Sequence, residues 1–106
     1  MINAKYTVEG DIHTLVVVGH ANYAEYGKDI VCAGVSSLVQ ALIGWIEEND
    51  WEAECISIDE KGGEVIVSCA GGDKVSAVFE VTAIGLGQIA YSYPDHIQID
   101  NIGLAD

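Results

Sequence analysis

The spacing of the apolar residues constrains the fold of this chain more than any other feature. Near the N-terminus, Ile2, Ala4, Tyr6 and Val8 alternate with polar neighbours, which is the period of a half-buried strand. The turn "EGD" and the segment "IHTLVVVG" then predict a second strand that returns beside the first as a hairpin. From about Ile30 the apolar residues recur at intervals of three and four, which predicts a helix with one broad buried face: Val31, Val35, Leu38 or Val39, Leu42 and Ile46.

The second half of the chain repeats this order. Two β-rich runs around a Gly-Gly turn predict a second hairpin over residues 53–69, and a helical pattern begins at about Asp73 and stops at Pro94. Gly85 inside that pattern indicates close packing, because glycine in a helix interior costs roughly 1 kcal/mol relative to alanine. The segment "HIQID" predicts a last strand. The order ββαββαβ indicates an α+β fold with two helices and a mostly antiparallel sheet.

Length and cysteine usage predict a single domain over residues 1–106 in a reducing compartment. A chain of 106 residues folds without covalent staples, and its three cysteines show neither a disulfide framework nor the spacing of a zinc site. The N-terminus lacks the features of a secretory signal, and the longest apolar stretch, residues 31–46, is short for a membrane span. We therefore expect a soluble cytoplasmic protein with no membrane contact, no metal and no cofactor.

The charge of the chain bears on its partners. Asp and Glu number 17 against four lysines and no arginine, which leaves a formal net charge of −13. Such a surface repels nucleic acid and has no guanidinium to bind phosphates, so we expect no direct nucleic-acid binding. The charge favours encounter with a basic partner, although taken alone it is more simply explained by a generally acidic soluble surface.

The residues with the clearest chemical potential are His20 and Cys32. Cys32 stands where the first helix is predicted to begin, so backbone N–H groups and the helix dipole would favour its thiolate, the nucleophilic form. His20 ends the second predicted strand, and the intervening loop can bring it to face the thiol as a proton donor and acceptor. A structural role stays open, because cysteine is often a small core residue and a strand-end histidine is often a surface residue.

The neighbouring residues have two interpretations each. Asp29 precedes the helix, so it either caps the helix or orients His20. The small residues after Cys32, which are Ala33, Gly34 and Ser36, either leave room for a substrate backbone or pack against another helix. The remaining cysteines and histidines are interpreted as structural: Cys55, Cys69, and His13 and His96 within strand patterns.

The stretch "GHANYAEYGKDIVCAGVS" resembles the signature of the ribosomal-processing cysteine protease family, Prp. Members carry G-H-A, a short variable loop, and G-x-D-I-V-C-A followed by a small residue and Ser. The final "YPDHIQI" and the order of the elements also resemble the family, so the likeness spans nearly the whole chain. The matching positions are Gly19, His20, Ala21, Gly27, Asp29, Ile30, Val31, Cys32, Ala33 and Ser36.

The resemblance implies an endopeptidase that removes a short N-terminal extension from a bacterial large-subunit ribosomal protein, cutting after an aromatic residue. It implies Cys32 as the nucleophile and His20 as the general acid and base, with Asp29 and Ser36 at supporting or orienting positions. It also implies a homodimer. The substrate precursor would be basic, so the acidic charge of this chain would steer it.

The loop over residues 21–28 must admit an extended peptide if this assignment holds. Tyr23 and Tyr26 could cover an aromatic substrate side chain, and Gly27 could act as a hinge. We therefore predict a loop that is mobile in the free enzyme and ordered over bound peptide, with a rigid loop as the alternative.

Two functions of other classes remain open from the sequence. The first is a non-catalytic ribosome-assembly factor that binds a basic ribosomal protein through the acidic surface, and it predicts that loss of the thiol is harmless. The second is a redox sensor, which predicts reversible oxidation of Cys32 and no proton transfer through His20.

Overall fold

The computed structural model describes residues 1–25 and 27–100 and contains the elements that the sequence predicts, in the predicted order. The first helix begins at Ile30 and the second at Asp73, where the periodicity placed them, and Tyr93 caps the second helix directly before Pro94. The bounds in chain order are β1 Ile2–Glu9, β2 Ile12–Val18, α1 Ile30–Glu48, β3 Ala53–Lys61, β4 Glu64–Gly71, α2 Asp73–Ser92 and β5 Ile97–Asp100.

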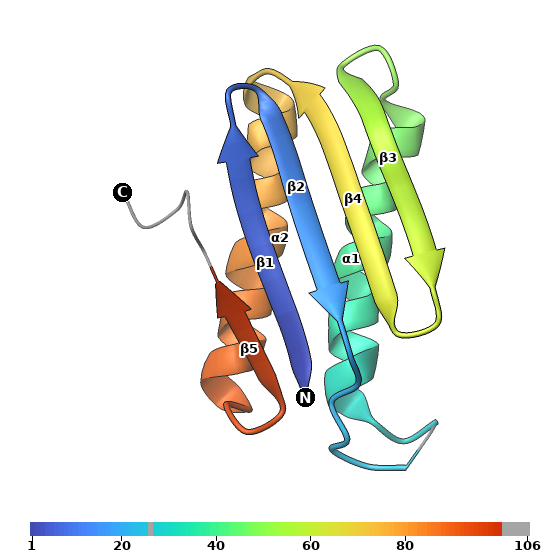
Figure 1. Ribbon diagram of the computed structural model, residues 1–106, viewed down its shortest axis with the longest axis vertical. Coiled ribbons are helices and arrows are strands. Elements are labelled where there is room, and N and C mark those ends of the chain that lie inside the picture. Colours follow the sequence, from blue (N-terminus) through green and yellow to red (C-terminus); the bar gives the residue numbers. More distant parts are fainter. Residues whose placement is uncertain (26, 101–106) are drawn as a thin grey trace.

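The strands form one five-stranded sheet in the order β3-β4-β2-β1-β5. All neighbours pair antiparallel except β1 and β5, which are parallel, so the prediction of a mostly antiparallel sheet is confirmed. Both helices lie on the same face of the sheet, which is the far face in Figure 1, with α2 behind β1 and β2 and α1 behind β4. The end of β2 and the start of α1 therefore meet at one end of the sheet, joined by the loop over residues 19–29.

The core fills the space between the sheet and the two helices. On β1, the alternation of the sequence places Ile2, Ala4 and Tyr6 in the interior. The helices approach each other closely at Gly85, where an added methyl carbon would lie 2.9 Å from both Leu38 methyl groups, which confirms the predicted close packing. The buried row of α1 follows the predicted period: Val31, Val35, Val39, Leu42, Ile43 and Ile46.

Both helices are long and apolar enough to cross a membrane by length and composition alone, with mean hydropathies of 1.6 for α1 and 1.2 for α2. The core helix of a folded domain has the same properties, so this similarity is weak evidence for a membrane span. In this fold the apolar rows of both helices contribute to the core beneath the sheet.

A buried aromatic stack links the sheet to α2. The rings of Tyr6, His13 and Phe79 all contact one another, with centroids 5.5 to 6.0 Å apart, and a 2.7 Å hydrogen bond joins the Tyr6 hydroxyl to His13 Nδ1. Burial, reinforced by the charge of Glu80, raises the pKa of Tyr6 to about 12. Burial also lowers the pKa of His13, although the carboxylates of Glu80 and Asp11 act in the opposite direction. His13 is therefore a neutral core residue at neutral pH, as the structural interpretation expected.

Two residues lie elsewhere than the sequence indicated. His96 is in the turn before β5 rather than in the strand, because its N–H and that of Ile97 both donate to the Tyr93 carbonyl and close a turn. Cys55, which was interpreted as a structural residue, is exposed on β3. The strand β3 is at the sheet edge and its register shifts between Cys55 and Ser57. Cys69 is buried in β4.

Candidate active site

The end of β2 places His20 beside the turn between β3 and β4. The Gly19 N–H donates to the Gly63 carbonyl at 2.7 Å, which ties the two segments together. Gly63 has a φ of +80°, and a methyl carbon added there would lie 3.1 Å from His20 Nε2. The imidazole is exposed to solvent, and the backbone of Gly63 forms the surface on which it rests.

The first turn of α1 places Cys32, and Asp29 caps that turn. The Asp29 carboxylate accepts the Cys32 N–H at 2.9 Å, and its carbonyl accepts the Ala33 N–H at 3.0 Å. The second carboxylate oxygen accepts the Tyr23 N–H at 3.0 Å, so Asp29 also fastens the loop to the helix. These N–H groups, with that of Cys32 first, hold the pKa of Asp29 below its usual range. The carboxylate is therefore ionised at neutral pH.

The Cys32 thiol is half-buried and accepts a hydrogen bond from the Ala21 N–H at 3.4 Å. Hydrogen bonds to sulfur are long, and this N–H is directed at the atom that would act as the nucleophile. Cys32 also stands in the first turn of α1, beside the Asp29 carboxylate, which interacts with its side chain. The predicted placement of the thiol at a helix start, next to a backbone N–H, is therefore present.

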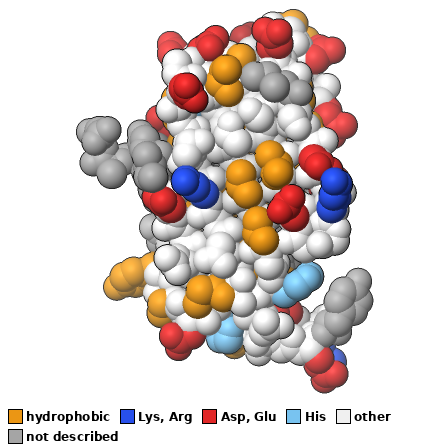
Figure 2. Space-filling model, viewed as in Figure 1, with side chains coloured by type: hydrophobic (Ala, Val, Ile, Leu, Met, Phe, Trp, Pro, Cys, Tyr) orange, Lys and Arg blue, Asp and Glu red, His pale blue; other side chains and the backbone are white. Residues whose placement is uncertain are grey.

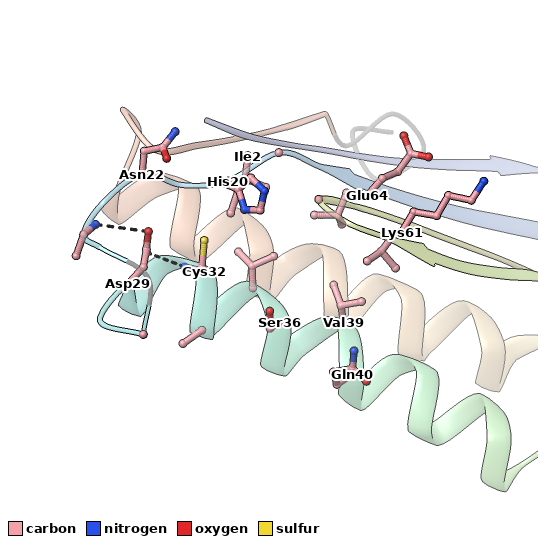
Figure 3. Close-up of a pocket in the computed structure, with 18 residues that line it drawn as sticks. Ile2, His20, Asn22, Asp29, Cys32, Ser36, Val39, Gln40, Lys61 and Glu64 are labelled. Atoms are coloured by element: carbon pink, nitrogen blue, oxygen red, sulfur yellow. Dashed lines mark hydrogen bonds between the residues drawn. The ribbon is translucent and has the colours of Figure 1, made fainter.

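His20 and Cys32 line the same cavity of about 710 Å³. Figure 3 shows the sulfur pointing from α1 to the side of the cavity on which His20 lies, with Ser36 one turn further along the helix. The cavity continues along α1 to Gln40, opposite Lys61 and Glu64 of the β3–β4 hairpin. Its lining is partly apolar: Ile2, Val17, Val35, Val39 and Val65.

The structure separates the two interpretations of the small residues near Cys32. Ala33 and Ser36 line the cavity. Gly34 instead faces α2, where a methyl carbon added to it would lie 3.2 Å from Ile89 Cδ1. Asp29 also lines the cavity, and its carboxylate interacts with backbone N–H groups and with the Cys32 side chain; within the described residues none of these contacts is with His20.

The loop residues predicted to bind substrate lie in different places. Gly27 lines the cavity and has a φ of +88°, a conformation that favours glycine. The Tyr23 ring packs edge-to-face on Tyr93 and His96, outside the residues that line the cavity. Tyr26 lies outside the described residues.

Sequence reasoning did not identify Gly63 as part of the site. The only local signal was the Gly-Gly turn of the second hairpin, which predicts a turn but not what packs against it. The contact with His20 depends on β4 pairing with β2, a long-range pairing that periodicity does not specify.

We expect Gly63→Ala to lower the rate of peptide cleavage roughly tenfold, because a displaced imidazole loses its alignment with the thiol. Alanine is strained at a φ of +80°, and its methyl group would crowd His20 Nε2. Cleavage of a peptide substrate measures the effect. The control is Gly10→Ala in the β1–β2 turn, where φ is +64° but an added methyl carbon meets nothing within 4 Å. Equal activity of the two variants would contradict a role of Gly63 in placing His20.

The sequence is similar to a known protein family over nearly its whole length. The family model described as "Cysteine protease Prp" matches residues 1–98. A ribosomal processing cysteine protease Prp of Mycoplasma genitalium is 35% identical over 91 residues, which cover 81% of this chain and 85% of that protein. The protein of the same name from Staphylococcus aureus is 31% identical over 108 aligned residues, covering 94% of this chain and 98% of that protein.

Solved structures show the same similarity in three dimensions. The Staphylococcus aureus protease Prp, crystallised with a covalently linked product peptide, superimposes with a TM-score of 0.82 and 26% identity, covering 95% of this chain and 99% of that one. A Streptococcus mutans protein superimposes with a TM-score of 0.72 and 27% identity, covering 96% and 94%.

Proposed function

The chain belongs to the cysteine protease Prp family, and we propose that it removes the N-terminal extension of a bacterial large-subunit ribosomal protein. The observation that carries this proposal is the cavity in which a cysteine at a helix start and a histidine at a strand end lie together. The names of the relatives, which are ribosomal processing proteases, support the class of substrate.

In the proposed mechanism His20 takes the proton of the Cys32 thiol, and the thiolate attacks the carbonyl carbon of the scissile peptide bond. The C–N bond then breaks as His20 gives this proton to the leaving amine, which leaves a thioester on Cys32. A water molecule next attacks the thioester while His20 accepts its proton. The C–S bond breaks, and the thiol and the free carboxylate product are regenerated.

The chemistry of the cavity supports an aromatic residue before the scissile bond. The wall beyond Cys32 is partly formed by aliphatic side chains, which favour an apolar substrate group over a charged one. The aliphatic side chains that line the cavity are Ile2, Val17, Val35, Val39 and Val65. The cavity extends from Cys32 along α1 to Gln40, so several substrate residues could bind in extended form.

The charge distribution supports a basic substrate. Figure 2 shows Asp and Glu side chains at the top, along the edges and at the bottom of this face. A field of this sign attracts a lysine-rich ribosomal protein and repels nucleic acid. We propose a cytoplasmic enzyme that works without a membrane or a cofactor.

We also propose that the enzyme is a homodimer. The outer side of α2 leaves Val81, Ile84 and Tyr91 exposed, with exposed fractions of 66%, 55% and 87%. An apolar row of this kind supports association with a second copy. Sedimentation equilibrium of the purified protein distinguishes a dimer from a monomer.

The loop over residues 21–28 is proposed to order over bound peptide. Its first half is fastened by Asp29, whereas Gly27 provides backbone freedom next to the cavity. We expect hydrogen exchange in residues 25–28 to be fast in the free Cys32→Ala protein and clearly slower with a peptide that covers the cleavage site. Equal exchange in the two states would favour a preformed, rigid loop.

The function is tested by incubating the purified protein with a ribosomal protein precursor that carries the extension. We expect mass spectrometry to show the shortened protein and the released peptide, with the cut after an aromatic residue. A stable complex with uncut precursor would instead support the non-catalytic assembly factor. The same precursor with its extension deleted is the matched control and should stay unchanged.

A further inference from the structure

His96 occupies a rigid position next to the active-site loop. Its N–H donates to the Tyr93 carbonyl at 2.9 Å, and its own carbonyl accepts the Ile2 N–H at 2.9 Å. The backbone of His96 is therefore held between the end of α2 and the start of β1. Its ring is half-buried and packs edge-to-face against Tyr23, with 5.2 Å between the ring centroids.

The imidazole of His96 holds the backbone of the loop directly after His20. His96 Nδ1 lies 2.9 Å from the Ala21 carbonyl oxygen. A carbonyl oxygen only accepts hydrogen bonds, so Nδ1 must carry the proton and donate it. Ala21 itself is 1% exposed, so water does not replace this donor easily.

The next residue gives the loop its direction. Asn22 has a φ of +54°, in the left-handed region, which asparagine adopts more readily than most residues with side chains. The peptide group before Asn22 is held by His96 through the Ala21 carbonyl, and the peptide group after it by Asp29 through the Tyr23 N–H. The two contacts hold the backbone on both sides of Asn22.

The Ala21 N–H lies one Cα away from the carbonyl that His96 holds, and it donates to Cys32 Sγ at 3.4 Å. We propose that His96 is a positioning residue: by holding the Ala21 carbonyl, it keeps the Ala21 N–H aimed at the Cys32 sulfur and so favours the thiolate. His96 does not touch the reacting atoms. The inference rests on the proposed function of Cys32 as the nucleophile.

Two substitutions at one position separate the hydrogen bond from the packing of the ring. His96→Phe keeps a ring against Tyr23 but removes the donor, whereas His96→Asn keeps a side-chain N–H near the position of Nδ1. The measurement is the rate of Cys32 alkylation by iodoacetamide as a function of pH, followed by mass spectrometry, together with cleavage of the precursor.

We expect the alkylation profile of His96→Phe to move to higher pH by about one unit, with a roughly tenfold lower rate on its rising limb. Cleavage should fall in parallel, and His96→Asn should restore most of both. A wild-type profile for His96→Phe would overturn the proposal, as would equal shifts in both variants, which would indicate lost packing alone. Thermal unfolding of each variant shows whether the fold is intact.

The test also separates this inference from the proposed function. If the wild-type protein cuts the precursor and the His96 variants keep its alkylation profile, the protease assignment stands and the role of His96 does not. If the wild-type protein fails to cut, the assignment fails, whereas the alkylation profiles still report on His96.

Discussion

Cys32→Ala should abolish cleavage of the ribosomal protein precursor, with a loss of roughly a thousandfold or more, because the variant has no atom that can form the thioester. The fold should survive, since alanine has the highest helix propensity and Cys32 is only half-buried at the start of α1. Asp29 still caps the helix in this variant, because its contact is with the backbone N–H of residue 32.

The measurement is a mass-spectrometric time course of precursor and product with equal amounts of wild-type and variant protein. Cys55→Ser is the matched control, because Cys55 is an exposed cysteine on β3 and does not line the cavity. It should cut at the wild-type rate. Product formation by Cys32→Ala at that same rate would exclude Cys32 as the nucleophile and would indicate another nucleophile or a contaminating protease.

His20→Ala should lower the cleavage rate by roughly two to four orders of magnitude, the usual contribution of a general acid and base. Both the formation of the thiolate and the protonation of the leaving amine lose their proton carrier. The sharper measurement is the pH profile of Cys32 alkylation. If a protonated His20 stabilises the thiolate, the wild-type protein should react at lower pH than the variant.

Val18→Ala is a suitable control for His20→Ala. Val18 ends β2 two positions before His20 and is 38% exposed, so its truncation perturbs the same strand end without touching the thiol. We expect wild-type cleavage and a wild-type alkylation profile for this variant. Identical profiles for wild type and His20→Ala would mean that the two residues do not interact, and the proposed pair would be wrong.

The secondary structure was predictable because each element repeats a local pattern of burial. The alternation from Ile2 to Val8 and the three- and four-residue spacing from Val31 to Ile46 follow directly from which side chains face the core. The start of α1 was predicted at about Ile30, and the structure has it at Ile30 with Asp29, one of the preferred capping residues, directly before it. The turn at His96 was missed. His96 directly precedes β5 and is half-buried, so it continues the alternating pattern of the strand although it lies outside it.

The motif predicted that His20 and Cys32 form the proposed reactive pair, and both residues line one cavity, but the contacts around them were not predictable. Gly63 meets His20 only because β4 lies beside β2, and His96 reaches the Ala21 carbonyl across a sequence separation of 75 residues. Neither contact has a local signature. The sequence could not decide whether Asp29 caps the helix or orients His20, or whether Gly34 leaves room for substrate or packs against a helix. Each choice depends on which residues contact Asp29 and Gly34 in the folded chain.

The amino-acid sequence by itself determined the order of the elements, the faces that they bury and the two candidate reactive residues, because local periodicity and a contiguous motif encode these properties. Only the tertiary structure decided the strand order β3-β4-β2-β1-β5, the parallel addition of β5 and the surroundings of the thiol. The physical reason is that strand pairing and side-chain contacts join segments distant in the chain. Their free energy depends on which surfaces meet, which no local pattern specifies.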